Sequence, residues 1–419
     1  MADLRWSPAA GVVSRKVAFL LSLAMVANLP AFARKAKAAG SGEGGAVAIS
    51  VLADPLVESA NRHFYNLEYE QATADFQKYL DLHPNDPNAV NHLLSCILMH
   101  QLYKMGAMNT GEYANDSFIG EAHRQADPKV KERLKQLFTR AEGLEEQELR
   151  VNPNNVDAYY SRGVTRAQFA VYTALIERAW FSALRSALGA RRDHEKVLEM
   201  NPGYVDAKLV VGVHNYVVGS LPWSVKAAVT MVGLGGSKEK GLQDLREVAN
   251  SDGENSTDAK VILSLFLRRE HQYEEACGIM RGLAQRYPRN YLFALEQANL
   301  LRAEGKNQEA AAMYRAVWQK GKQGKYDGLH YEMAAWGLGE LLRSEKDYSG
   351  AAEAYELVNQ VSNPDPEILQ KANLSAGEMY DLTKQRDLAM RKYQVVLAEN
   401  SDSVPAEQAR KNMRSAYRE

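Results

Sequence analysis

The sequence predicts an all-α protein, a right-handed superhelix of antiparallel helix pairs, and three observations support this. A spacing of 34 residues recurs in the second half of the chain, where it separates Ala276 from Ala310 and Met280 from Tyr314. Glycine and proline gather at short junctions, and the stretches between them are rich in residues that favour helix over strand. With 419 residues, of which 46% are hydrophobic, the chain is able to bury a large core. We expect almost no β-sheet.

The charge balance excludes a general affinity for nucleic acid or anionic lipid. The 51 basic residues oppose 52 acidic ones, so the formal net charge is -1 and a partner must be recognised by local features. The two cysteines, Cys96 and Cys277, lie in separate apolar helical patterns. Stacked helix pairs do not bring the Cα atoms of two such cysteines within the roughly 7 Å of each other that a disulfide needs. We therefore predict two buried free thiols.

Residues 1–33 have the pattern of a cleaved secretory signal peptide. Basic residues up to Lys16 precede an apolar run at 17–29, and a small-aromatic-small sequence ends at Ala33, before the expected cut. The run is shorter than the roughly twenty residues that a spanning helix needs, so a retained anchor is the alternative. A flexible linker is expected over 34–52. The pattern predicts export to the periplasm or the cell exterior, with membrane association left open.

The first helix pair carries small and aromatic landmarks at Ala60, Phe64, Ala72, Phe76 and Pro84. Together with the 34-residue period, these landmarks resemble the tetratricopeptide repeat (TPR) family over most of residues 53–400. The resemblance implies helix pairs that stack to bury a continuous core and a concave surface that binds other chains. It predicts an irregular region at 53–250, a regular array at 251–400 and a capping helix at 401–419.

The N-terminal half departs from the regular spacing. A second helix pair is expected from Asn88, with its partner helix at 129–150 and a loop rich in glycine, asparagine and aspartate between them. In a third pair, Gly163 and Ala190 lie 27 positions apart, where the family spacing is about 12. Each helix of that pair is therefore predicted to be about two turns longer than usual.

An apolar insert at 217–242 separates the two helices of a fourth pair. Its Leu-Pro and Gly-Leu-Gly-Gly order resembles a eukaryotic TPR family linked to inclusion-body clearance, whose members are associated with membranes. The resemblance implies an interfacial segment. The alternative is a helical hairpin packed on the array's own core. The residues of the insert expected to contact a membrane or a partner are Leu221, Pro222, Trp223, Val225 and Met231.

The TPR resemblance also implies which side chains line the concave surface, because the family uses fixed positions on the first helix of each unit. One of these positions carries Arg268, Arg302 and Arg343 in three successive units, and then Asp381. Three arginines on one stripe suit an acidic or carboxyl-terminal peptide, and a solvated stripe is the alternative. The lysine and asparagine pattern of chaperone-binding members is not reproduced. The predicted groove residues are Arg268, Arg269, Asn299, Arg302, Trp336, Glu340, Arg343 and Glu378.

No catalytic, metal-binding or cofactor-binding residues are predicted. The segment from Gly233 to Lys238 lacks the order of a phosphate-binding loop, and the histidines lack the spacing of zinc ligands. Glu145, Glu146 and Glu148 follow a run of basic residues on one expected helix. We therefore predict a solvated charged face there rather than a catalytic carboxylate pair.

The leading hypothesis is a non-enzymatic, extracytoplasmic TPR scaffold that binds a partner protein or peptide, but no nucleic acid, in its concave groove. The second is a membrane-peripheral protein that uses the 217–242 insert. The third is an enzyme with a pocket in the region 88–250. Such a pocket would be lined by His92, His100, Tyr159 or His214. The oligomeric state and the identity of the partner do not follow from the sequence.

Overall fold

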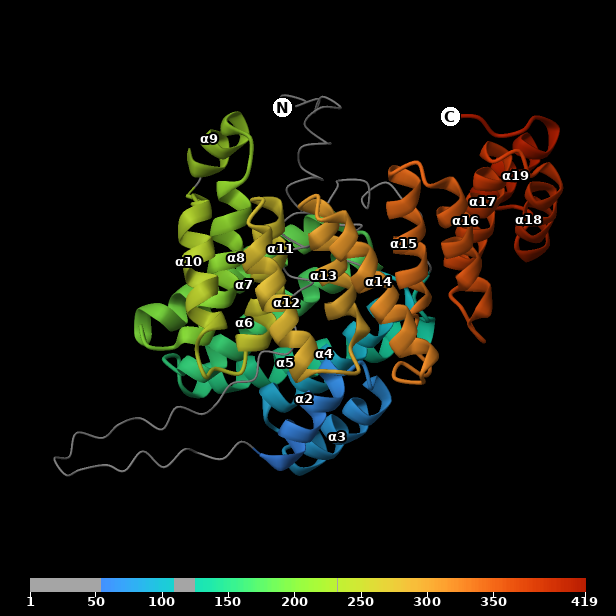
Figure 1. Ribbon diagram of the computed structural model, residues 1–419. Helices are drawn as coiled ribbons and strands as arrows, with labels where there is room; N and C mark the ends of the chain where they lie inside the picture. The colour runs from blue at the N-terminus through green and yellow to red at the C-terminus, as the bar shows by residue number, and fades with distance from the viewer. Residues whose placement is uncertain (1–53, 109–124, 232) are drawn as a thin grey trace, which may run out of the picture. The chain divides into compact units, whose positions relative to one another are not determined.

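The computed structural model describes residues 54–108, 125–231 and 233–419, and these residues form helices and connecting turns with no β-strand (Figure 1). This confirms the all-α prediction. The predicted signal peptide and linker, 1–33 and 34–52, lie outside the described residues, as does most of the loop expected within the second helix pair. Among the described helices, none is both long and apolar enough to cross a membrane.

The chain divides into two compact units, and the boundary lies between Glu270 and His271. The helices of the first unit are α2 (Pro55–Tyr65), α3 (Tyr69–Leu82), α4 (Pro87–Lys104), α5 (Pro128–Val151), α6 (Val156–Val171), α7 (Trp180–Met200), α8 (Lys208–Gly219), α9 (Trp223–Met231), α10 (Lys238–Ala249) and α11 (Ser256–Arg269). Those of the second unit are α12 (Tyr273–Arg286), α13 (Tyr291–Ala303), α14 (Asn307–Lys322), α15 (Glu332–Ser344), α16 (Tyr348–Leu357), α17 (Pro366–Leu382), α18 (Arg386–Glu399) and α19 (Val404–Arg414).

Several helices begin at an aspartate followed by proline. Asp54, Asp86, Asp127 and Asp365 each accept a hydrogen bond from the backbone N–H two residues later, and a proline occupies the first helical position. The carboxylate satisfies a donor that the helix leaves unpaired, and the fixed φ angle of proline suits the first turn. This dipeptide therefore determines where α2, α4, α5 and α17 start.

The pair formed by α6 and α7 is longer than the regular pairs, as predicted. Helix α6 continues into a π-helical turn, so helical backbone runs from Val156 to Ile176, and α7 has 21 residues. By comparison, α13 in the second unit has 13 residues. The difference corresponds to about two turns per helix.

The fourth pair consists of α8 and α10, whose backbones approach closely at glycine. A Cβ atom on Gly241 would lie 2.6 Å from the carbonyl oxygen of Gly212, so a larger residue does not fit there. Figure 1 shows α9 beyond one end of this pair. The repeat is thus closed by α8 and α10, and the inserted helix extends from it.

The helix α11 is joined to α2 and α6 of the same unit through buried polar groups. Tyr65 on α2 donates a hydrogen bond of 2.7 Å to Asp258 on α11. Asn255, which precedes α11, donates one of 2.8 Å to the hydroxyl of Tyr160 on α6. Asp258 is fully buried, and burial raises the pKa of its carboxyl well above the usual range. These contacts join helices that lie far apart in the sequence.

The second unit is a regular array held together by small and aromatic side chains. The landmark residues Ala310, Tyr314, Ala351, Tyr355, Ala389 and Tyr393 are all buried. The rings of Tyr355 and Tyr393 occupy space that glycine leaves open on the preceding helix: a Cβ atom on Gly377 would lie 2.5 Å from Cε1 of Tyr393. The alternation of a small residue with a large ring therefore sets the distance between helices in this array.

Both cysteines, Cys96 and Cys277, are buried free thiols, which confirms that prediction. Burial raises the pKa of each thiol, so the reactive thiolate form is suppressed. Packing rather than cross-linking stabilises the two units.

The predicted solvated face is wrong for one of its three glutamates. Glu146 is exposed, but Glu145 is fully buried, because it follows Phe138 and Ala141 at helical spacing on the buried face of α5. One oxygen of Glu145 accepts hydrogen bonds from Ser161 Oγ at 3.0 Å and from the neighbouring Thr165 Oγ1 at 2.6 Å. Burial raises the pKa of this carboxyl from about 4.5 to about 7 despite these bonds.

The pKa of Glu145 predicts a pH-dependent stability. Because the folded chain binds the proton more tightly than the unfolded chain, this contribution is complete below pH 4.5 and is lost as the pH rises through 7. We expect the free energy of unfolding of the wild type to fall by about 2 kcal/mol more between pH 5 and 8 than that of Glu145→Gln. Urea unfolding at both pH values measures this difference. Glu146→Gln is the matched control and should keep the wild-type pH dependence; an identical pH dependence in Glu145→Gln would contradict the prediction.

Candidate functional site

The predicted groove residues divide between the two units. Arg268 and Arg269 lie near the end of α11 in the first unit. The others lie on three helices of the second unit: Asn299 and Arg302 on α13, Trp336, Glu340 and Arg343 on α15, and Glu378 on α17. We call the surface formed by these six residues and Asp381 the groove face. It is the part of the predicted site that the structure brings together.

Tyrosines from the second helix of each pair hold two groove residues in place. The hydroxyl of Tyr314 donates a 2.6 Å hydrogen bond to Oδ1 of Asn299. The hydroxyl of Tyr355 likewise donates a 2.6 Å hydrogen bond to Oε1 of Glu340. In both bonds, the tyrosine follows its acceptor residue by fifteen positions. Burial, assisted by the Glu340 carboxylate, raises the pKa of Tyr355, so its hydroxyl remains a donor. The packed core therefore orients polar groups on the groove face.

The arginines of the groove face each reach the following repeat. Arg302 Nη2 donates to the backbone oxygen of Glu340 at 3.3 Å, and Arg343 Nη1 forms an ion pair of 3.1 Å with Glu378. Glu378 is only 6% exposed, and burial raises the pKa of its carboxyl although Arg343 favours the charged form. The side chain of Arg343 remains 25% exposed. These arginines thus have partners within the array and also face solvent.

Trp336 is the aromatic residue of the groove face. It is half-buried, and its ring lies 5.3 Å from the ring of Tyr355 at an interplanar angle of 46°. This contact fixes one side of the indole and leaves the remainder accessible. A rigid, partly exposed tryptophan beside arginine is a common anchor in peptide recognition.

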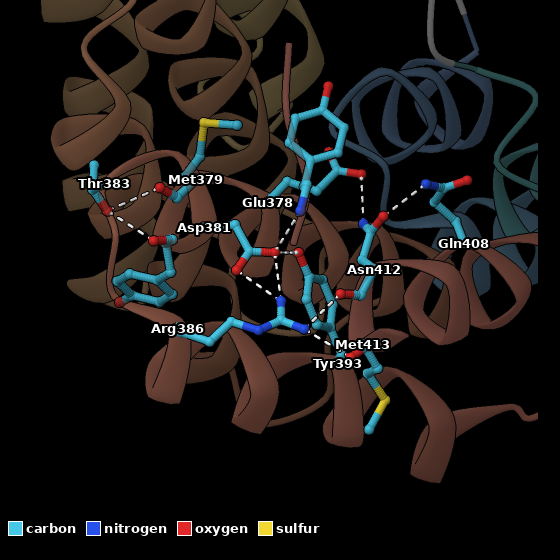
Figure 2. Close-up of polar contacts among 11 residues, drawn as sticks. Glu378, Met379, Asp381, Thr383, Arg386, Tyr393, Gln408, Asn412 and Met413 are labelled. Carbon is cyan, nitrogen blue, oxygen red and sulfur yellow. Dashed lines mark hydrogen bonds and ion pairs between the residues drawn. The ribbon is translucent and has the colours of Figure 1, made fainter. Parts of the chain in front are cut away.

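Asp381 lies at the position where earlier repeats carry arginine; its side chain is fully buried and joins α17, α18 and α19 (Figure 2). Both of its oxygens accept from Arg386 Nη1, at 2.8 and 2.9 Å, and Oδ2 also accepts from the hydroxyl of Tyr393 at 2.8 Å. Arg386 Nη2 donates to the carbonyl oxygens of Asn412 and Met413, each at 2.8 Å. One ion pair therefore links α17 and α18 to the last turn of α19.

The segment that follows α19, residues 415–419, returns across the groove face. The backbone N–H of Tyr417 donates to Asp381 Oδ2 at 2.8 Å, and Arg343 Nη2 donates to the hydroxyl of Tyr417 at 2.9 Å. Glu419 Oε2 accepts from the hydroxyl of Tyr348 at 2.8 Å, and its Oε1 lies 3.6 Å from Arg343 Nε. The sequence predicts that this segment is part of a capping helix over 401–419, whereas α19 ends at Arg414 and nothing in the composition indicates that the chain then folds back. Asp381 occupies a recognisable repeat position but is not among the predicted groove residues.

The insert residues are placed differently from the groove residues. Leu221 is buried at 7% exposure and Pro222 is exposed. Trp223 and Met231, at the two ends of α9, are 84% and 89% exposed. The side chain of Val225 lies outside the described residues. This differs from a hairpin packed entirely on the core, because the two large apolar side chains at the ends of α9 face solvent.

One cavity of about 410 Å³ opens in the second unit. It is lined by Ala284, Pro288, Asn290, Ala294, Lys320, Gln323, Gly324, Lys325 and Tyr326. None of the histidines or the tyrosine proposed for an enzyme pocket belongs to this lining. In the part of the chain that the structure describes, no group of three or more histidine, cysteine, aspartate or glutamate side chains is arranged to hold a metal ion.

The stacked helix pairs with their buried alanine and tyrosine landmarks form a helical-repeat solenoid of the tetratricopeptide type. Within it, residues 205–364 match the family model described as Iml2/Tetratricopeptide repeat protein 39. This stretch includes the insert, whose local order resembles the inclusion-body clearance family, and the match agrees with that resemblance. No curated protein matches the chain.

Several solved structures are similar to the chain. PilF of Pseudomonas aeruginosa is 17% identical with a TM-score of 0.35, covering 61% of this chain and 97% of that one. A tetratricopeptide repeat protein of Parabacteroides merdae is 14% identical with a TM-score of 0.32, covering 80% and 97%. The human IFIT1 dimer with m7Gppp-AAAA is 13% identical with a TM-score of 0.40, covering 96% and 88%. At these values the similarity carries no information on function.

The Asp381–Arg386 pair should be important for the stability of the last repeat. Arg386→Met leaves a buried carboxylate without its cation and the end of α19 without two donors, so we expect the free energy of unfolding to fall by about 3 kcal/mol. Urea unfolding measures this change, and hydrogen exchange of α19 should report faster opening. Arg391→Met, an exposed arginine on the same helix, is the control and should change stability by less than about 0.5 kcal/mol. If Arg386→Met changed the free energy of unfolding as little as the control does, the prediction would be contradicted, because solvent would then compensate for the loss of the Asp381–Arg386 ion pair.

Proposed function

We propose that this chain is a non-enzymatic scaffold, exported from the cytoplasm, that binds a partner protein or peptide on the groove face. The observation that carries the proposal is the arrangement of Arg302, Trp336 and Arg343, which are partly exposed and oriented by contacts with the array core. Guanidinium groups beside a fixed indole suit a peptide that supplies carboxylates and an apolar or aromatic side chain.

The proposed location rests on the pattern of residues 1–33, with its basic start, apolar run and small residues before the cut. A periplasmic or extracellular scaffold would meet its partner in the cell envelope or outside it. Mass spectrometry of the native protein from fractionated cells tests this: an N-terminus near Arg34 in an exported fraction is the expected result, and an intact chain in the cytoplasm would refute export.

The groove face is tested by a triple substitution. Arg302→Ala, Trp336→Ala and Arg343→Ala together should reduce capture of the partner from an envelope extract at least tenfold, because aromatic and arginine anchors dominate such interfaces. A pull-down with the full chain, followed by quantitative mass spectrometry, measures the loss.

The matched control is Arg281→Ala with Arg315→Ala, two exposed arginines on α12 and α14 that lie outside the groove face. This control should capture the partner as the wild type does. Circular dichroism must show that the triple variant is folded. A folded triple variant that retains full capture would refute binding at the groove face.

The second candidate function is peripheral contact with a membrane, and the exposure of Trp223 and Met231 on the nine-residue apolar helix α9 favours it. Two large apolar side chains held in water can gain about 1.5 to 3 kcal/mol each on burial. A tryptophan at such a position suits the boundary between headgroups and acyl chains.

Flotation with vesicles of phosphatidylcholine and phosphatidylglycerol tests this function. Trp223→Ser with Met231→Ser should lower the vesicle-bound fraction of the chain at least tenfold in partition coefficient, because most of the apolar area of contact is removed. Phe181→Ser on α7 removes another exposed aromatic residue and serves as the control. Equal flotation of the double variant and the wild type would place the contact elsewhere or exclude it.

A further inference from the structure

We propose that residues 415–419 act as an internal ligand of the groove face, and that the partner is a peptide of the same chemistry that displaces them. That chemistry is an extended stretch with an aromatic side chain followed two residues later by a carboxylate, as in Tyr417 and Glu419. This inference rests on the proposed function, since it names the class of peptide that the groove face binds and the way its access is regulated.

The backbone of the segment is held as a bound peptide would be. Tyr417 N–H donates to the buried carboxylate of Asp381 at 2.8 Å, a group already held by Arg386 and Tyr393. Asp381 is therefore a fixed acceptor that does not depend on the segment for its own charge compensation. A main-chain N–H is available in every peptide, so this contact gives position rather than sequence preference.

Two side chains of the segment supply the specificity. Arg343 donates to the hydroxyl of Tyr417, and its guanidinium carbon lies 5.7 Å from the centre of that ring, within the range of a cation–π contact. Glu419 accepts from Tyr348 at 2.8 Å and lies 3.6 Å from Arg343. In an extended chain, residues two apart face the same side, which explains how both side chains reach one arginine.

The segment is bound loosely enough to be exchanged. The Glu419 side chain is 39% exposed and its contact with Arg343 is long, so the ion pair contributes little. Arg343 keeps its shorter pairing with Glu378 when the segment leaves. Displacement thus leaves no buried charge without a partner, and the array does not have to unfold to open the groove face.

The segment covers only part of the groove face. Its hydrogen bonds are with Asp381, Arg343 and Tyr348, whereas Arg302 and Trp336, on other parts of the groove face, remain partly exposed. A partner that reaches beyond the segment gains these additional anchors, while it competes for Arg343. Such a partner overcomes the internal ligand without binding Arg343 any more tightly.

A direct binding experiment tests the proposal with a defined probe. The probe is a fluorescent peptide of residues 413–419 with both ends blocked, and binding is followed by fluorescence anisotropy to the full chain. The double variant Tyr417→Ala with Glu419→Gln, whose own segment lacks both side chains that contact Arg343, should bind the probe at least about tenfold more tightly than the wild type. A control peptide with the same two substitutions should not bind.

Two further measurements complete the test. Arg343→Gln in the double variant should weaken probe binding at least tenfold if the probe occupies the site of the segment. Hydrogen exchange on the wild type should show that the amide of Tyr417, which donates to Asp381, is protected and loses protection when saturating probe is added. This second measurement needs no substitution, so it decides the matter even if Arg343→Gln fails to fold.

The outcomes separate this inference from the proposed function. Equal probe affinity in the wild type and the double variant, or an unprotected Tyr417 amide in the wild type, overturns the internal ligand even if the partner is captured through Arg302 and Trp336. A protected Tyr417 amide that the probe exposes, with probe affinity that depends on Arg343, supports it. If the triple variant then captures the partner as well as the wild type, the proposed function fails while the contact of the segment stands.

Discussion

The second unit depends on one recurrent interaction, the insertion of a tyrosine ring from the second helix of a pair into space left by glycine on the first helix. Tyr393 against Gly377 shows the geometry, and Tyr355 repeats it one unit earlier. The ring is buried, but its hydroxyl donates to a polar residue of the same first helix that belongs to the groove face. The same contact that closes the core therefore sets the chemistry of the exposed surface.

A second regularity follows along the array. At one position of each first helix, the side chain reaches forward: Arg302 contacts Glu340, and Arg343 contacts Glu378. On α17 the position is an aspartate, Asp381, that accepts from Arg386 and through it secures α19. The change from arginine to aspartate thus replaces a forward contact to the next helix pair with a pairing that holds the single helix α19.

The extent to which the sequence predicts this molecule varies with the origin of each contact. The helix pairs, the lengthened α6 and α7, and the free thiols follow from periodic patterns and spacing, which are local properties. The burial of Glu145 also follows from a local pattern, because Glu145 falls on the same helix face as Phe138 and Ala141. The charged residues around it favour a solvated face instead, and that prediction is wrong. The return of residues 415–419 arises from tertiary contacts of a segment without a repeat, for which a period gives no information.

The two candidate surfaces differ in what binding requires of them. Trp223 and Met231 are 84% and 89% exposed, so α9 would gain free energy simply by transfer of apolar area from water. The groove face is the opposite case, because Arg302, Glu340, Arg343 and Glu378 already have partners within the chain. A ligand there must replace existing contacts, and its affinity is the difference between new and old interactions. A surface of that kind discriminates by chemistry rather than by area, which is the property expected of a selective scaffold.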